Sequence, residues 1–359
     1  MKIGIDTQSL KGHLSGLGIY TSQIITALKR IDDSNEYVLL GEQRQIGQKT
    51  YDRLIWENFG LRKESAKNKI DLLFTPAFAA PFLKGPWRSV AVIHDLIGKI
   101  FPENLSAASR FYWSQWLPHV NSKCDSIIAD SQVTKDDILK FTKIDEKKVD
   151  VVYLAAPDRF NLPRNKAQID AVMHKFGIKP PYFFFVGNIE PRKNLIRTIK
   201  AFMHAQQSGK IDHMLILVGS RSWNYPQMDA LLKESSFRDK VKILNYVDDE
   251  ELLSLYNGAD LFVFPSLYEG FGIPILEAMK CGVPVLTSRL SSIPEIAGDA
   301  AFYVDPYREE AIAEGMIELA TNSKLRTELT DKGRRQASKF DWDSTARKTR
   351  DIFNKLGSL

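Results

Sequence analysis

The sequence predicts an α/β protein with two doubly wound domains, each built around a parallel sheet. Both halves of the 359-residue chain alternate short apolar runs with helical patterns, which is typical of βαβ units. The run Tyr182–Val186 is almost continuously apolar, as expected of a parallel strand that is buried on both faces. The length leaves room for two domains that each bury a core. Ligands of such sheets bind beside the carboxyl ends of the strands, so functional residues are expected there.

The first half contains six predicted strands. They lie at Ile3–Asp6, Tyr37–Leu40, Ile70–Phe74, Ser89–Ile93, Ile127–Ala129 and Val149–Leu154. Helices are predicted after Gly18, at 50–61 and after Ser131, whose hydroxyl suits a helix N-cap. The aromatic residues of 106–120 are expected in the core or in the wall of a cleft, where some could stack on sugar rings. The helix at 50–61 mixes apolar and basic residues, so it either covers a sheet or faces a membrane or an anionic glycan lipid.

The second half repeats the pattern after a proline-containing linker at 155–166. Its strands are predicted at Tyr182–Val186, Met214–Val218, Val241–Leu244, Leu261–Phe264, Val283–Leu286 and Ala301–Val304, with helices between them and three helices after the last. We therefore expect a first domain at 1–166, a second at 167–339 and a C-terminal helix at 340–359.

The stretch 262–284 carries the clearest functional pattern. A strand leads into the loop Glu269-Gly270-Phe271-Gly272, and a helix begins near Pro274. A helix N-terminus behind a glycine loop offers unpaired N–H groups and partial positive charge, which suits phosphate. Glu269 and Glu277, which we place in the first helical turn, could accept hydrogen bonds from hydroxyls on either side of a diphosphate, as in a nucleotide sugar. Alternatively, Glu277 only complements the helix dipole and Glu269 lies in solvent.

A second loop adds positive charge at a strand end. Strand 182–186 runs into Gly187 and Asn188 and then reaches Arg192 and Lys193 before the next helix. These adjacent cations would neutralise a diphosphate and the charge that builds up on it as the sugar–phosphate bond breaks. The alternative is that both side chains are solvated loop residues.

The first half offers two further candidates. His94 directly follows the strand at 89–93 and therefore lies where ligands bind in an open parallel sheet, unless it is a structural histidine. Gly16 and Gly18 follow the first strand at a distance that does not fit a dinucleotide-binding fingerprint. They fit a flexible glycine loop that meets a phosphate, or an ordinary connection between a strand and a helix.

The composition is that of a globular protein, with 44% hydrophobic and 26% charged residues. The formal charge of +5 is mild, and no clustered nucleic-acid-binding module is recognised, so we expect no nucleic-acid partner. Cys124 and Cys281 are expected to be buried thiols in a reducing compartment. A strand at the very start and the lack of a long apolar run predict a cytoplasmic protein, with peripheral membrane contact left open.

These motifs resemble glycosyltransferase family 4, retaining enzymes of the GT-B class that include bacterial mannosyltransferases of surface-polysaccharide synthesis. The resemblance covers nearly the whole chain. It rests on the glutamate pair Glu269 and Glu277, the early glycine loop, His94, the segment Asn245-Tyr246-Val247-Asp248 and the C-terminal Phe340-Asp341-Trp342.

The resemblance implies a GT-B fold, with two Rossmann-like domains that face each other across a cleft. It implies that Glu269 and His94 contact the donor sugar and that Glu277 holds the ribose. The other donor-binding positions it implies are Gly16, Gly18, Tyr246, Val247, Gly270, Phe271 and Gly272. Lys193 takes the role of the family's lysine, whereas Asn188 stands where many members have an arginine, which Arg192 would replace. The helix at 340–359 is expected to cross back onto the first domain.

The expected function is transfer of a hexose, with retention, from a nucleotide diphosphate sugar to a glycan or lipid-linked glycan acceptor. The resemblance favours mannose from GDP-mannose, with no permanently bound cofactor and no metal. UDP-sugar-dependent glucosyl or N-acetylhexosaminyl transfer and nucleotide-sugar epimerisation stay open. Asp341 and Asp343 could be read as a metal-binding pair, but they precede a helix, where an aspartate cap explains the first of them better.

Overall fold

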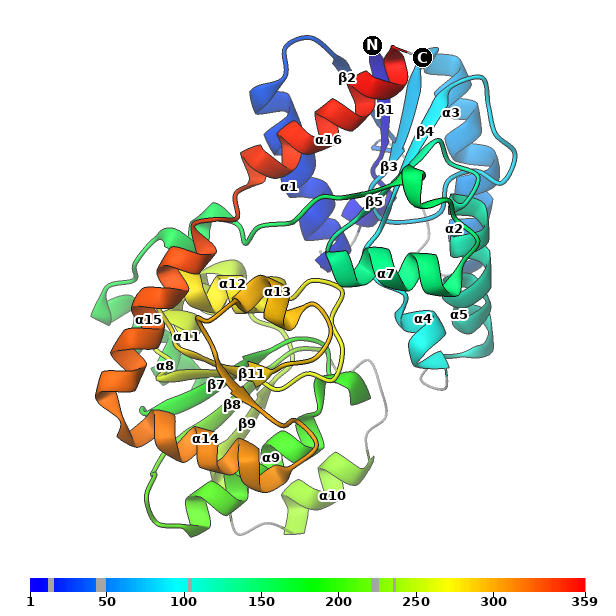
Figure 1. Ribbon diagram of the computed structural model, residues 1–359. Coiled ribbons are helices and arrows are strands. Elements are labelled where there is room, and N and C mark those ends of the chain that lie inside the picture. The colour runs from blue at the N-terminus through cyan, green and yellow to red at the C-terminus, as the bar shows by residue number, and fades with distance from the viewer. Residues whose placement is uncertain (12–15, 43–49, 103–104, 221–225, 235–236, 359) are drawn as a thin grey trace. The chain divides into compact units, whose positions relative to one another are not determined.

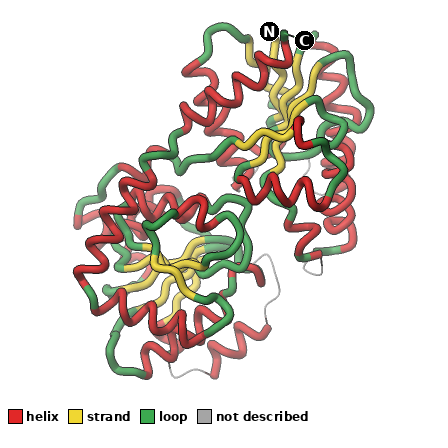
Figure 2. Tube along the Cα trace, in the orientation of Figure 1, coloured by secondary structure: helices red, strands yellow, loops and turns green. Residues whose placement is uncertain are grey.

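The computed structural model describes residues 1–359 except 12–15, 43–49, 103–104, 221–225, 235–236 and 359 (Figure 1). The chain divides into two compact units. Unit 1 comprises Met1–Leu154 and Asp341–Leu359, and unit 2 comprises Ala155–Phe340. Each unit contains one six-stranded sheet with helices around it (Figure 2).

The sheet of unit 1 has the strand order β2-β1-β3-β4-β5-β6, and all of its neighbouring strands run parallel. The strands are β1 (Lys2–Asp6), β2 (Glu36–Leu40), β3 (Leu72–Thr75), β4 (Arg88–Ile93), β5 (Ser126–Ala129) and β6 (Val149–Val151). β3 and β5 are buried along their whole length, as the apolar sequence of a parallel strand requires. The order reverses between β1 and β3, and such a reversal opens a crevice at the carboxyl ends of the strands.

The helical elements of unit 1 include two π-helical turns. The elements are η1 (Gln8–Leu10), α1 (Gly16–Ile31), α2 (Thr50–Ile55), η2 (Trp56–Gly60), α3 (Leu61–Asn68), α4 (Ile97–Ile100), α5 (Ala107–Phe111), η4 (Tyr112–Trp116), α6 (Leu117–Asn121), α7 (Gln132–Phe141), η5 (Glu146–Lys148) and α16 (Trp342–Gly357). The π turn η2 interrupts the helix that we expected to be continuous at 50–61, and η4 joins α5 to α6. Each inserts one residue and so changes which face the following side chains occupy.

The C-terminal helix α16 packs within unit 1, beside α1 (Figure 1). Asp341 is its N-cap and accepts a hydrogen bond from the Ser344 N–H at 2.7 Å. The Thr345 hydroxyl donates to the Tyr153 carbonyl at 2.7 Å, and the Phe353 ring lies 5.1 Å from that of Phe74. The helix expected at 340–359 therefore belongs to the first unit, and the predicted cap function of Asp341 is confirmed.

The sheet of unit 2 has the order β12-β11-β10-β7-β8-β9 and is also parallel throughout. Its strands are β7 (Tyr182–Val186), β8 (Met214–Val218), β9 (Val241–Leu244), β10 (Leu261–Phe264), β11 (Val285–Ser288) and β12 (Phe302–Val304). Because β8 and β9 lie on one side of β7 and β10 lies on the other, the order reverses between β7 and β10. The predicted α/β class, with two doubly wound sheets, is confirmed.

Helices surround this second sheet. They are η6 (Asp158–Asn161), α8 (Lys166–Phe176), η7 (Pro191–Lys193), α9 (Leu195–Gln207), α10 (Pro226–Glu234), η8 (Arg238–Lys240), α11 (Asp249–Asn257), α12 (Ile273–Lys280), α13 (Ile293–Ala297), α14 (Glu309–Thr321) and α15 (Ser323–Ala337). α14 packs on α9, and α15 packs on α12.

The boundary between the units falls at 154/155, earlier than the expected 166/167. The segment 155–166 belongs to unit 2 because polar contacts hold it there. Lys280 Nζ donates to the Ala156 carbonyl at 2.9 Å, and Arg164 forms an ion pair with Glu250. The proline-containing stretch that we expected to be a linker therefore packs against the second unit.

Candidate functional site

The reversal of strand order in unit 2 brings together the two loops that carry the candidate residues. β7 ends at Val186 and is followed by Gly187, and the neighbouring strand β10 ends at Phe264. At the same edge, a Cβ atom on Gly219, whose φ is +156°, would lie 1.9 Å from the Gly187 carbonyl oxygen, so only glycine fits. The backbones after β7 and β8 therefore lie in close contact at the carboxyl edge of the sheet, where ligands of such sheets bind.

The loop after β7 is fixed to the loop after β10. Asn194 follows η7 in the left-handed conformation, with φ +61°, which asparagine tolerates better than most residues. Its buried side-chain amide donates to the Pro265 carbonyl at 3.2 Å and to the Pro306 carbonyl at 2.7 Å. Lys193 and Arg192, directly before it, are thereby held against the end of β10.

Glu269 binds both predicted cations. Lys193 Nζ lies 2.6 Å from Glu269 Oε1, and Arg192 Nη1 lies 2.7 Å from Glu269 Oε2. The Ser266 hydroxyl also donates to Oε1, at 2.6 Å. Arg192 Nη2 pairs in turn with Glu190 Oε1 at 2.6 Å. The structure thus joins three predicted residues in a network of two cations and two carboxylates, in which Lys193 and Glu269 are buried and Arg192 and Glu190 are partly buried.

This network sets the ionisation of its members. Glu269 is only 6% exposed, and burial alone would raise its pKa, but the charges of Arg192 and Lys193 outweigh that effect and lower the pKa to about 2. Burial, together with the charge of Arg192, lowers the pKa of Lys193 against the opposing effect of Glu269. Glu269 is therefore a carboxylate at any physiological pH, and the alternative that it lies in solvent is wrong.

The glycine loop is held by hydroxyl groups. The Ser292 hydroxyl donates to the carbonyls of Glu269 and Phe271, at 2.9 and 3.0 Å, and Ser291 also donates to the Glu269 carbonyl. Gly272, with φ +105°, precedes α12 in a conformation that only glycine adopts readily. The expected loop 269–272 followed by a helix is thus present, and its backbone is fixed.

Glu277 lies one turn further along α12 than we expected. It is the fifth residue of α12, not part of the first turn, and its side chain is buried. The Tyr256 hydroxyl donates to its Oε2 at 2.9 Å. Burial raises the pKa of Glu277 to about 7, with Tyr256 opposing the rise. The effect of the helix dipole falls off within the first turn, so it does not by itself explain a buried carboxylate at this position.

The remaining predicted positions of unit 2 lie in the loops after β7 and β9. Asn188, after β7, accepts a hydrogen bond from the Ser220 hydroxyl at 2.9 Å. Tyr246 is 71% exposed on the loop between β9 and α11, whereas Val247 is buried beside it. Asp248 is the N-cap of α11 and forms a capping box with Glu251. The role of Tyr246 and Val247 beside a base stays a prediction.

The predicted residues of unit 1 lie at the carboxyl edge of the first sheet or close to it in the sequence. His94 follows β4, and both of its ring nitrogens are partnered: Nδ1 lies 2.5 Å from Asp130 Oδ2 and Nε2 lies 2.8 Å from the Pro76 carbonyl oxygen. Gly16 and Gly18 belong to the first turn of α1. The preceding part of the expected glycine loop, 12–15, lies outside the described residues. The predicted contacts of these three residues with a donor stay predictions.

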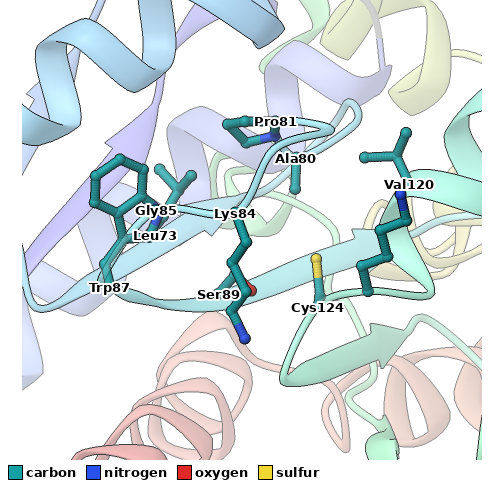
Figure 3. Close-up of a pocket in the computed structure, with 10 residues that line it drawn as sticks. Leu73, Ala80, Pro81, Lys84, Gly85, Trp87, Ser89, Val120 and Cys124 are labelled. Carbon is teal, nitrogen blue, oxygen red and sulfur yellow. The ribbon is translucent and has the colours of Figure 1, made fainter.

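A pocket at the opposite edge of the unit 1 sheet does not match these residues. Figure 3 shows Leu73, Trp87, Ser89 and Cys124 among its lining residues, and the last two lie at the amino ends of β4 and β5. Its volume of about 10 Å³ suffices for about one water molecule. The wrong edge and the small volume argue against a substrate site.

Sequence reasoning missed four residues that complete the candidate sites. Glu190, Ser266 and Tyr256 hold the predicted side chains of unit 2, and Asp130 holds His94. Asp130 could have been found, because it directly follows β5 just as His94 directly follows the neighbouring strand β4. Tyr256 carries no such signal, since its distance from Glu277 depends on how α11 packs.

Within the residues that the structure describes, no group of three or more His, Cys, Asp or Glu side chains could hold a metal ion. Asp343, the second member of the aspartate pair, forms an ion pair with Arg30 instead. Among the same residues, no helix is both long and apolar enough to cross a membrane.

Comparison with known proteins matches both halves of the chain. Residues 11–157 match Glycosyltransferase Family 4, and residues 168–336 match the glycosyl transferases group 1. O-antigen chain mannosyltransferase B of Escherichia coli is 30% identical over 270 residues, which are 75% of this chain and 71% of that protein. O-antigen chain mannosyltransferase RfbU of Salmonella typhimurium is 29% identical over 240 residues, 67% of this chain and 62% of that protein. The chain spans only about a third (34%) of the serotype-specific mannosyltransferase WbdA of Escherichia coli, to which it is 30% identical over 282 residues.

Solved structures with the same fold cover nearly the whole chain. Sucrose-phosphate synthase from Thermosynechococcus elongatus superposes with a TM-score of 0.77 at 19% identity, covering 99% of both chains. Anabaena Alr3699/HepE, solved in complex with UDP-glucose, gives 0.74 at 18% identity over 100% of both chains. The fold and the matched domains define a glycosyltransferase of the GT-B class. The chain belongs to glycosyltransferase family 4, as its motifs predicted.

Proposed function

We propose that unit 2 binds a nucleotide diphosphate sugar at the carboxyl ends of β7 and β10, with the diphosphate beside Arg192 and Lys193. The buried carboxylate of Glu269 between these two cations carries the proposal. A buried charge is costly unless it is paired, so a network of four charged groups at the carboxyl ends of strands indicates a binding site for a charged ligand. The HepE structures, solved in complex with UDP and with UDP-glucose, support a nucleotide sugar in a protein of this fold.

The residues divide the work of transfer by charge. Arg192 and Lys193 bind the diphosphate and stabilise the charge that it gains as the sugar leaves. Glu269, ionised throughout the physiological pH range, accepts hydrogen bonds from the sugar. Its negative charge stabilises the positive charge that develops on the sugar ring. Glu277 accepts hydrogen bonds from the ribose. Arg192 takes the place of the arginine that the family often has at the position of Asn188. With two cations at the diphosphate, no metal ion is required.

We propose that transfer retains the configuration of the sugar. The bond between the anomeric carbon and the phosphate oxygen breaks, and the acceptor hydroxyl forms the new bond on the same face while its proton passes to the departing phosphate. A covalent sugar intermediate would need a carboxylate nucleophile. Hydrogen bonds from Lys193, Ser266 and Arg192 stabilise the charge of the Glu269 carboxylate, which makes it a poor nucleophile.

The donor sugar proposed is mannose from GDP-mannose, and the acceptor is a glycan or lipid-linked glycan of a bacterial surface polysaccharide. The mannosyltransferases of O-antigen chains among the relatives support this choice. UDP-linked glucose or N-acetylhexosamine is the alternative that the HepE structures suggest. An epimerase that converts the donor without an acceptor is the second class of function with this architecture.

A donor screen followed by a transfer assay tests the proposal. We expect one nucleotide sugar of a panel to raise the melting temperature, because a ligand at 100 times its Kd adds about 2.7 kcal/mol to the free energy of unfolding. With that donor, release of the nucleoside diphosphate should depend on a glycan acceptor, and NMR of the product should show the anomeric configuration of the donor. Conversion of the donor in the absence of any acceptor would instead identify an epimerase.

We further propose that unit 1 contacts a membrane surface through an apolar groove formed by Leu54, Ile55, Phe59, Phe82, Leu83 and Phe111. The groove has a volume of about 380 Å³. Phe59 is 72% exposed, Ile55 and Leu83 are each 58% exposed, and Phe111 is 52% exposed. The π turns that begin at Trp56 and Tyr112 bury those two side chains, while Phe59 of the first turn and Phe111, just before the second, face outward. Such a concentration of exposed apolar side chains marks an interaction surface.

Basic side chains at the groove favour an anionic lipid surface as the partner. Arg62 lines the groove, Arg110 precedes Phe111, and the Lys123 ammonium lies 3.6 Å from the centre of the Phe82 ring. Each basic group near an anionic membrane adds about 1 kcal/mol to binding. An acceptor linked to a lipid would be reached from the same surface.

Sedimentation with lipid vesicles tests this contact. We expect the protein to bind vesicles that contain anionic lipid better than neutral vesicles, and Phe59→Ser to weaken binding about ten- to a hundredfold, since burying a phenylalanine contributes about 1.5–3 kcal/mol. Leu162→Ser is the matched control, because Leu162 is 60% exposed on unit 2. Equal vesicle binding by both variants, or no binding by the wild-type protein, would contradict the proposed membrane contact.

A further inference from the structure

The side chain of His94 is held between two hydrogen-bond acceptors at the carboxyl edge of the unit 1 sheet. Nδ1 faces Asp130 Oδ2 at 2.5 Å, and Nε2 faces the Pro76 carbonyl oxygen at 2.8 Å. Asp130 is 2% exposed, and its other oxygen, Oδ1, has no hydrogen-bond partner in the described part of the chain. The neighbours β4 and β5 place the pair in register, since Ile93 is opposite Ala129.

The positions of the protons follow from these partners. A carbonyl oxygen can only accept, so Nε2 must carry a hydrogen. Nδ1 and the carboxylate of Asp130 also need one proton between them, because two lone pairs at this distance would repel. The pair therefore holds one proton more than a neutral histidine beside an ionised aspartate. The buried charge of Asp130 has His94 as its partner, which favours the imidazolium form.

The other groups that face His94 do not supply an alternative proton donor. Tyr20 of α1 packs edge-on against the ring at 4.7 Å, and burial raises its pKa well above 10, so it stays neutral. The Thr134 hydroxyl of α7 donates to the backbone carbonyl of His94. Asp95, the next residue, adds a second negative charge. Burial alone would lower the pKa of His94, but the charge and hydrogen bond of Asp130 outweigh it and raise that pKa above its ordinary value. Burial also raises the pKa of Asp130, against the charge of His94, so both shifts favour one shared extra proton on the pair.

The hydrogen bond to the Pro76 carbonyl lets the His94 ring hold a buried loop in place. Residues 76–81, after β3, are buried throughout. Besides His94, the loop is held by Asn121, whose Oδ1 accepts from the Ala80 N–H at 3.0 Å, and by Tyr112, whose hydroxyl accepts from the Ala79 N–H at 3.3 Å. Loss of the proton from His94 would leave a lone pair facing Asp130 and weaken this arrangement.

We propose that Asp130 is a positioning residue that keeps the proton on Nδ1 of His94, so that His94 is an imidazolium at neutral pH and cannot accept a proton. His94 then acts as a fixed positive charge whose Nε2–H holds the loop at Pro76. A sugar hydroxyl that reached Nε2 would have to replace the Pro76 carbonyl as the acceptor. The consequence for transfer rests on the proposed function, whereas the protonation state does not.

NMR of protein labelled at its histidine rings tests the proton positions directly. We expect His94, assigned by its absence in His94→Gln, to show two protonated ring nitrogens at pH 7, with exposed His174 and His204 as internal references. In Asp130→Asn the carboxylate charge is lost but an acceptor oxygen remains, so the midpoint of the His94 titration should move to lower pH. The wild-type spectrum decides even if the variant does not fold.

An unprotonated Nδ1 at pH 7, or the same midpoint in wild type and Asp130→Asn, would overturn the proposal. The pH dependence of transfer activity supplies the functional readout. Activity should fall as the pH rises through the midpoint of the His94 titration. Asp130→Asn should move this fall in activity to lower pH and leave the KM for the donor unchanged. A profile that Asp130→Asn does not move would overturn the consequence for transfer. Failure of donor binding would contradict the proposed function alone and leave the NMR result intact.

Discussion

Replacing Lys193 with methionine is expected to lower the turnover number about 10²- to 10³-fold, the usual cost of removing one preorganised charge-stabilising donor. Methionine keeps most of the length of the side chain, which packs beside the Phe264 ring, where Nζ lies 4.7 Å from the ring centre. Glu269 keeps Arg192 and Ser266 as partners, so the fold should survive. The loss therefore reports on the charge at the donor diphosphate.

Lys200→Met is the matched control for this prediction. Lys200 lies on α9, the helix that follows Lys193, and its side chain is 44% exposed in an ion pair with Glu309 at 3.2 Å. Surface pairs of this kind contribute at most about 1 kcal/mol to stability, so the control should keep its turnover number and its melting temperature. Steady-state kinetics and thermal unfolding of the two variants, measured side by side, check the prediction. Equal turnover in Lys193→Met and Lys200→Met would remove Lys193 from the diphosphate site.

Much of the fold could be predicted because parallel strands that are buried on both faces leave a clear apolar signal. Tyr182–Val186 and Leu261–Phe264 were placed at their observed bounds. The two π turns could not be predicted, since they depend on how Trp56 and Tyr112 pack in the core rather than on local preference. The polar contacts of 155–166 with unit 2 are likewise absent from any local pattern, so the boundary was placed too late.

The residues of the site could be predicted where they directly follow predicted strands or lie in the loops after them. Arg192, Lys193 and Glu269 follow neighbouring strands, and the strand order that joins them is set by tertiary structure. That Glu269 binds both cations could not be read from the sequence, because the two loops are more than 70 residues apart. For the same reason Tyr256 was missed as the partner of Glu277.

Glu269→Gln and Glu277→Gln are expected to have different effects on donor binding. Glu277→Gln should weaken binding of both the free nucleoside diphosphate and the nucleotide sugar, because it removes the charged acceptor of the ribose hydroxyls. A hydrogen bond to a charged group contributes about 1.5–3 kcal/mol, which corresponds to about 10- to 150-fold in affinity. Glu269→Gln removes the carboxylate that neutralises Arg192 and Lys193. The free nucleoside diphosphate should then bind as well as before or more tightly, while transfer is lost.

The pH dependence of binding adds a second signature of Glu277. Its pKa is raised to about 7, so the carboxylate that accepts from the ribose predominates above pH 7 and the protonated form below it. Affinity of the wild-type protein should therefore rise between pH 6 and 8. Glu277→Gln, which has no such group to titrate, should lose this part of the pH dependence.

Calorimetric titration of both glutamine variants with the free nucleoside diphosphate and with the nucleotide sugar measures this division of roles. We expect Glu277→Gln to weaken the binding of both ligands. Glu269→Gln should leave the affinity for the free nucleoside diphosphate unchanged or increased and lose only the affinity that the sugar contributes. If Glu269→Gln weakens the free nucleoside diphosphate as much as Glu277→Gln does, or if neither variant affects either ligand, the donor site is not where we place it.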